Sequence, residues 1–281
     1  MSFIAIRKPY LLKISLDEDA FNPREEYEHL GKMVCWHRRY RLGDGHCYET
    51  PGDFLQELVE KNVEEEELIR QAKAGKIQGI KLGYVRAERL WEVKSYSAVY
   101  HRWVRLYGFD EPISRCGAQI AEAVRSEMDN HALLKLAEKQ CCILPVYLFD
   151  HSGLHISTYD LTKCPDGRWD AGQVGWVYAD RDTIARKYGK CGREEMKRAG
   201  EMLVAEVEQY DRYLAGECYG FQLYEAGEEK DSCWGFLGTL DEIRQDIAEY
   251  LPEDCRGLLE HLVEMPDMRQ MEYADYEEME V

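Results

Sequence analysis

Apolar residues recur along this chain with two periods, one typical of helices and one typical of strands. The clearest helical period runs through residues 193–215, where apolar side chains from Met196 to Leu214 stand three or four positions apart. The strongest strand signal is the apolar run at residues 143–149. Turn residues and a second, alternating run at 154–159 follow it. This order predicts a β-hairpin.

Capping residues predict where other helices begin. Thr50 followed by Pro51 suits the start of a helix. Thr239 with Glu242 forms a capping box for another helix, and Asp180 can begin a short one. Further helices are expected near residues 64–75, 118–124, 133–139 and 254–263, and further strands near 32–40, 173–178, 219–224 and 232–237.

The order of these elements predicts an α+β fold, mostly antiparallel sheet flanked by helices, because strands and helices do not alternate regularly. A helical, basic-aromatic insertion is expected between two parts of the core. Near the C-terminus the periodicity stops, which favours an acidic mobile tail. The predicted organisation is an N-terminal part of the core at 1–75, the insertion at 76–130, the remainder of the core with acidic helices at 131–264, and the tail at 265–281.

The net charge of −18 comes entirely from residues 201–281, which hold 23 Asp and Glu against 5 Lys and Arg. The first 200 residues hold 31 of each kind. Carboxylates fixed on helices can imitate the phosphates of DNA and occupy a basic groove of another protein. The alternative is that they only keep the protein in solution. The carboxylates expected at such a surface are Glu201, Glu206, Glu208, Asp211, Asp241, Glu242, Asp246 and Glu249.

Residues 76–107 have the opposite character, with seven Lys and Arg against two Glu and with Tyr and Trp interleaved. Arginines beside aromatic rings suit a nucleic-acid strand. The negative charge of the whole chain would repel DNA and favours a protein partner instead. The alternative is an amphipathic strand or helix whose aromatic side chains pack in the core and whose basic side chains face water. The residues expected to bind are Trp36, Arg38, Arg39, Arg41, Arg86, Arg89, Trp91 and Trp103.

Five blocks of the sequence carry a resemblance to a known family. They read LGKMVCWHRRYRLGDGH, ILPVYLFDHSG, WDAGQVGWVY, EVEQYDRYLAGECYGF and DSCWGFLG. In these blocks, within residues 28–60 and 140–240, the chain resembles a family of proteins from bacteriophages and integrative elements of gut and other low-GC bacteria. The family has no established activity, so no catalytic residue is carried over. The resemblance implies an accessory gene of a mobile element, a setting in which antagonists of host defence are common.

A metal-dependent hydrolase or nuclease is an alternative hypothesis, because histidines and carboxylates near strand ends suit metal binding and acid–base chemistry. On an extended chain, however, His151 and His155 would stand about 13 Å apart, too far for one metal. No zinc-ligand spacing, nucleophile elbow, P-loop or dinucleotide fingerprint occurs. We therefore predict no metal and no cofactor and leave enzymatic activity open. The residues of this alternative are His37, Asp44, His46, Asp150, His151 and Asp170.

Ten cysteines occur, none of them in a C-x-x-C pair. The first residues lack the apolar core and cleavage site of an export signal, and no run of about 18 apolar residues exists. We therefore expect reduced thiols, a cytoplasmic location in the host bacterial cell and no membrane association. The function predicted is binding and inhibition of another protein, such as a component of host anti-phage defence, through an acidic surface. Oligomeric state is left open.

Overall fold

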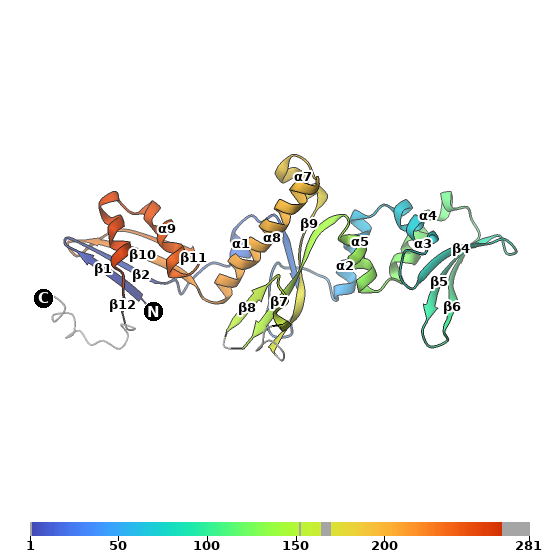
Figure 1. The fold of residues 1–281 in the computed structure, drawn as a ribbon, viewed down its shortest axis with the longest axis horizontal. Coiled ribbons are helices and arrows are strands. Elements are labelled where there is room, and N and C mark those ends of the chain that lie inside the picture. Colours follow the sequence, from blue (N-terminus) through green and yellow to red (C-terminus); the bar gives the residue numbers. More distant parts are fainter. Residues whose placement is uncertain (1, 152, 164–169, 266–281) are drawn as a thin grey trace. The chain divides into compact units, whose positions relative to one another are not determined.

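The computed structural model describes residues 2–151, 153–163 and 170–265, which confirm the predicted α+β fold with antiparallel sheets (Figure 1). The chain divides into two compact units. The first unit comprises Met1–His29, Tyr147–Gln173 and Val204–Val281, and the second Leu30–Val146 and Val174–Leu203. Beyond Met265, the predicted acidic tail lies outside the described residues.

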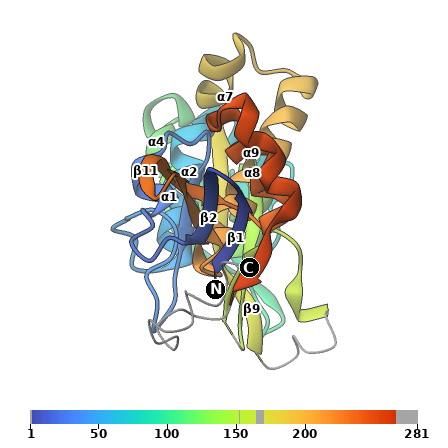
Figure 2. The same cartoon turned by 90° about the vertical axis from the view of Figure 1, so that its left-hand side faces the viewer.

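A five-stranded sheet forms the centre of the first unit, in the order β11-β10-β2-β1-β12. Its strands are β1 (Ser2–Arg7), β2 (Tyr10–Leu16), β10 (Cys218–Glu225), β11 (Glu228–Leu237) and β12 (Val263–Met265). Alternate residues of β10, such as Phe221 and Leu223, are buried in one cluster with Ile243 and Ile247. Those two isoleucines belong to α9 (Leu240–Tyr250), seen beside the β1–β2 hairpin in Figure 2. The 3₁₀-helix η2 (Glu253–His261) completes the cover of this face.

The first unit also contains the predicted hairpin. Strand β7 (Cys141–Asp150) pairs antiparallel with β8 (Leu154–Ser157), with Tyr147 opposite Ser157. These strands belong to a sheet of order β3-β9-β7-β8, in which β3 spans Lys32–Cys35 and β9 spans Ala171–Asp180. Strand β8 belongs to the first unit and β3 to the second, while β7 and β9 have residues in each. The first unit also contains α1 (Pro23–Glu26), η1 (Leu161–Lys163) and residues 204–214 of the predicted long helix α8 (Arg193–Leu214). Residues 193–203 of α8 belong to the second unit.

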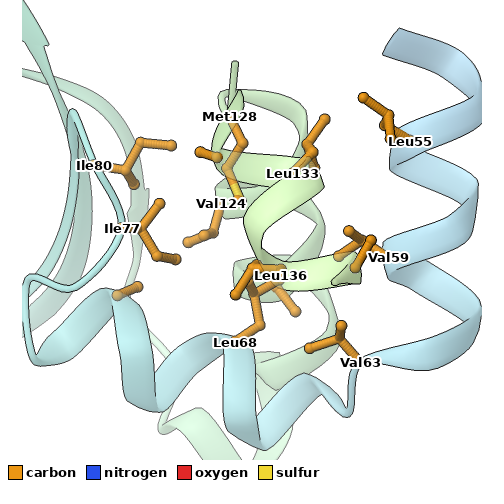
Figure 3. Packing of buried hydrophobic residues seen from close by; sticks show 14 of the residues in the cluster. Leu55, Val59, Val63, Leu68, Ile77, Ile80, Val124, Met128, Leu133 and Leu136 are labelled. Atoms are coloured by element: carbon orange, nitrogen blue, oxygen red, sulfur yellow. The ribbon is translucent and has the colours of Figure 1, made fainter. Parts of the chain in front are cut away.

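Helices surround one large apolar cluster in the second unit (Figure 3). The elements are α2 (Pro51–Asn62), α3 (Glu65–Lys73), β4 (Ile80–Val85), β5 (Leu90–Ser97), β6 (Arg102–Phe109), α4 (Ile113–Ser126), α5 (Asn130–Ala137) and α7 (Arg181–Tyr188). Ile80 and Val124, from the segment expected as an insertion, pack in the same cluster as Leu55 and Leu133. Residues 76–130 therefore share a core with the helices on either side of them in the sequence.

The predicted caps are present, but some segments differ from expectation. Thr50 and Asp53 form a reciprocal capping box, as do Thr239 and Glu242. The expected helix at 254–263 is instead the 3₁₀-helix η2, which ends before Val263 begins β12 and pairs with β1. The segment expected as a helical insertion contains the helix α4, but its residues 80–109 form three strands. No described helix has both the length and the apolar composition needed to cross a bilayer.

Candidate functional site

The β4-β5-β6 sheet of the second unit has one covered face and one open face. Helices α3 and α4 pack on it, and Ile80, Leu82 and Val93 point into the core beneath them. Since side chains alternate along a strand, the intervening residues face away from the core. The register places Lys81, Lys94 and Arg105 side by side, and Tyr96 beside Trp103. We call Lys81, Glu92, Lys94, Tyr96, Trp103 and Arg105 the outer sheet face.

A buried carboxylate organises the centre of the outer sheet face. Glu92 is only 5% exposed, forms an ion pair with Lys94 and accepts a hydrogen bond from Arg105 Nε at 2.9 Å. Arg105 also donates to both carboxylate oxygens of Glu88, at 2.8 and 3.0 Å. Burial alone would raise the pKa of Glu92, but the hydrogen bonds from Lys94 and Arg105 outweigh it and hold the pKa below its usual value. The charged network therefore fixes the orientation of the Arg105 guanidinium.

Aromatic rings flank this network, and cations of the same chain lie over them. Lys81 Nζ lies 4.2 Å from the centre of the Trp103 ring, and the Tyr96 ring meets Trp103 edge-on at 5.6 Å. Arg102 likewise lies 5.6 Å from the ring of Tyr100. These contacts hold the rings in place. They also cover a face of each ring that a nucleobase would use for stacking.

Exposed apolar side chains are concentrated around the same sheet. Among the described residues, those between 84 and 107 that are exposed are Tyr84, Tyr96, Val99, Tyr100, Leu106 and Tyr107. A grouping of exposed aromatic residues around arginine is typical of the centre of a protein–protein interface. Val99 is 83% exposed at the tip of the β5–β6 turn.

The arginines expected to bind are exposed, but two of the tryptophans are structural. Trp36 donates from its indole nitrogen to the Tyr48 carbonyl at 3.1 Å and contacts Phe54. Trp91 packs against the core, with Lys73 Nζ 4.6 Å from its ring. Both rings therefore serve the interior of the second unit. The exposed arginines are Arg38, Arg39, Arg41, Arg86 and Arg89.

Glu206 is buried and therefore does not belong to the predicted acidic surface. Glu206 is 6% exposed, with Arg24 Nη1 3.4 Å and His29 Nδ1 4.0 Å from its carboxylate oxygens. The sequence contains the signal, because Glu206 stands three residues after Leu203 and four before Tyr210, within the apolar stripe of α8.

Two more of the expected acidic residues have structural contacts. Asp211 accepts a hydrogen bond from the Ile156 N–H at 2.7 Å and so ties β8 to α8. Glu242 closes the capping box of α9 and accepts from Arg212 at 3.1 Å. The remaining predicted carboxylates, Glu201, Glu208, Asp241, Asp246 and Glu249, are exposed.

The His and Asp residues after β3 support a loop. His37 Nδ1 accepts from the Tyr40 N–H at 3.3 Å, and the two rings stack. Asp44 accepts from the Met33 N–H at 2.9 Å. His46 Nε2 lies 2.9 Å from the Cys35 carbonyl, so this nitrogen is the donor and carries the proton. Each side chain thus satisfies backbone groups of the turn that follows β3.

The other members of the metal-site hypothesis belong to the first unit. His151 Nδ1 lies 3.1 Å from Asp170 Oδ2, with both side chains exposed, and Asp150 ends β7 opposite Leu154. Within residues 2–151, 153–163 and 170–265, no three His, Cys, Asp or Glu side chains gather closely enough to hold a metal ion. The described residues therefore give the hydrolase alternative no metal site.

The buried thiols are poorly suited to act as nucleophiles. Burial raises the pKa of Cys141 to about 12 and that of Cys218 to about 11. Burial also raises the pKa of Cys142. Since the thiolate is the reactive form, these side chains are almost entirely protonated at neutral pH. Cys47, in contrast, is exposed.

We therefore expect selective alkylation of the native protein at pH 8. Iodoacetamide should modify the exposed Cys47 readily, whereas Cys141 should react only after denaturation, because a pKa of about 12 leaves roughly one thiolate in 10⁴ at this pH. Peptide mass spectrometry of timed samples measures both sites. Labelling of Cys141 as fast as Cys47 in the native protein would contradict the buried environment described here.

Several residues of the outer sheet face were not among those predicted. Sequence reasoning found Trp103 but missed Tyr96, Lys94 and Arg105. The signal was the alternation of Glu92, Lys94 and Tyr96 with the core-facing Trp91 and Val93. Comparisons of the chain with protein-family models, with curated proteins and with solved structures find no match. Function is therefore inferred from the surfaces of the two units.

Proposed function

We propose that this protein binds another protein through the outer sheet face. The observation that carries the proposal is the grouping of Tyr96, Trp103 and Arg105 on one sheet face, with Arg105 held in place by the buried Glu92. Tyrosine, tryptophan and arginine dominate the binding energy of protein interfaces. Because these side chains are already fixed by Lys81 and Glu92, little conformational entropy is lost when a partner docks.

The biological setting proposed is inhibition of a host protein by a product of a phage or mobile element, as the sequence resemblance implies. The acidic surface adds a second contribution. Between residues 204 and 265 the chain holds 16 Asp and Glu against 4 Lys and Arg. Such a field accelerates the approach of a basic partner. The exposed carboxylates Asp241, Asp246 and Glu249 of α9 supply part of it.

Truncating the aromatic centre should strongly weaken partner binding. We expect Tyr96→Ala and Trp103→Ala each to weaken binding about 30-fold, a typical effect for a central aromatic residue of an interface. The partner is first captured from the natural host with the wild-type protein and identified by mass spectrometry. Its Kd for each variant is then measured by calorimetry. Loss of capture by both variants, with unchanged thermal unfolding, supports the proposal.

The matched control is Tyr159→Ala, which removes another exposed tyrosine in the first unit. It should leave the Kd unchanged. Equal binding by wild type, Tyr96→Ala and Trp103→Ala would overturn the outer sheet face as the binding site.

A nucleic acid is the second candidate partner, because residues 76–107 have a net positive charge. A strongly salt-dependent gel shift of single-stranded DNA that Trp103→Ala abolishes would favour it instead.

A further inference from the structure

A cleft in the second unit lies between α2, α3 and α4, apart from the outer sheet face. Its volume is about 230 Å³. At about 30 Å³ for each water-sized group, it has room for the five heavy atoms of a lysine side chain or the seven of an arginine. The inference drawn here does not depend on the function proposed above.

The floor of the cleft is formed by apolar side chains, whereas polar atoms make up most of its exposed lining. Val59 of α2, Val63 at the C-cap of α2 and Leu68 of α3 contribute buried side chains to it, and Figure 3 shows all three at the edge of the apolar cluster. Ala118 and Ala121 of α4 complete the apolar part. An alkyl chain lying in the cleft would contact these side chains and lose its exposure to water.

The rim is acidic. Glu60, Glu65 and Glu122 line the cleft, and all three are exposed at its edge. Arg125 is the basic residue of the lining, and its guanidinium lies 3.2 Å from Glu60 while the side chain is 15% exposed. Glu65 and Glu122 leave the rim with a net negative charge.

An apolar floor under a negative rim fits a ligand with an alkyl stem and a cationic head. Lysine and arginine side chains have this build, since they bury their methylene stems along apolar surface and keep the charged head at its edge. A neutral apolar ligand would gain nothing from the rim, and an anion would be repelled by it. Charge complementarity therefore selects a basic side chain.

We propose that this cleft receives a lysine or arginine side chain of a partner protein. The stem lies on Val59, Val63 and Leu68, and the cation is held by the carboxylates of Glu65 and Glu122. The cleft is then a second contact site of the same chain, specific for a basic residue, in addition to the outer sheet face.

The test uses small probes that reproduce the side chain alone. n-Butylammonium and n-butylguanidinium are titrated into the full-length protein, and methyl NMR signals of Val59, Val63 and Leu68 are followed. We expect saturable shifts with a Kd on the order of 10 mM for either cation, as suits a ligand of five to eight heavy atoms. n-Butanol, which has the stem without the charge, should bind at least 5-fold more weakly.

Matched variants separate charge recognition from a simple apolar cavity. The double variant Glu65→Gln, Glu122→Gln should weaken binding of both cations at least 5-fold. Glu66→Gln, a neighbouring exposed residue of α3 that does not line the cleft, should leave it unchanged. Equal shifts with n-butanol, an unchanged Kd in the double variant, or no saturation below about 100 mM would each overturn the proposal.

Discussion

Replacing Gly175 by alanine should destabilise the protein by about 3 kcal/mol or more, because the added methyl group has no space in the β3–β9 pair. A Cβ at this position would lie 1.9 Å from the Val34 carbonyl oxygen and 2.8 Å from Cys35 Cα. Both neighbours are backbone atoms of the paired strand, with Cys35 directly opposite Gly175. Since a backbone cannot turn aside as a side chain can, the two strands must separate. Urea unfolding followed by circular dichroism measures the loss.

The matched control for this prediction is on the same strand. Gly172→Ala makes the same chemical change where a Cβ would meet nothing within 4 Å. Its free energy of unfolding should stay within about 0.5 kcal/mol of the wild-type value. Should both variants unfold at the same urea concentration as the wild type, the close approach of β3 and β9 would be wrong.

Replacing Arg24 by methionine should cost about 3–5 kcal/mol, because it removes the guanidinium from the buried Glu206 carboxylate. The Arg24 side chain is 1% exposed and that of Glu206 7%, so water screens neither. The pair joins α1 to α8 across 182 positions of sequence. Chemical denaturation gives the free energy of unfolding for each variant.

A double-mutant cycle separates the pair from the loss of packing. Arg24→Met together with Glu206→Leu removes both charges, and we expect it to be more stable than Arg24→Met alone. Arg212→Met is the control, since Arg212 lies on the same helix but pairs with the more exposed Glu217 and Glu242. It should cost about 1 kcal/mol or less. If the double variant lost as much stability as the two single variants added together, or more, the two side chains would not be coupled as described.

Local signals in the sequence were sufficient to place most helices and strands. The caps at Thr50, Asp180 and Thr239 need only residues within one turn, and the structure confirms each of them. The hairpin of β7 and β8 is similarly local. In these cases the residues that determine the structure are neighbours in the sequence.

Features that depend on distant residues were not predicted. The β1–β2 hairpin was missed, and β2 pairs with β10, some 200 positions later in the sequence. Periodicity places Glu206 in the apolar stripe of α8, but the partner that allows its burial, Arg24, lies near the other end of the chain. The outer sheet face was only partly identified, because the face that a strand residue occupies depends on the helices that cover the sheet. Periodicity in the sequence shows that one face of a strand is buried, but the tertiary contacts decide which face it is.

The five-stranded sheet has a consequence for the order in which the chain folds during synthesis. Its strands β1 and β2 are made first, but β10, β11 and β12 are made last. The central partner of β2 is therefore missing until residue 225 has left the ribosome, and the edge partner of β1 until residue 265. The core of the second unit, between Val34 and Cys141, can assemble earlier. Until then Leu12 and Ile14 of the β1–β2 hairpin, which are buried in the folded protein, remain exposed to water. Such exposed apolar side chains are what chaperones bind during translation.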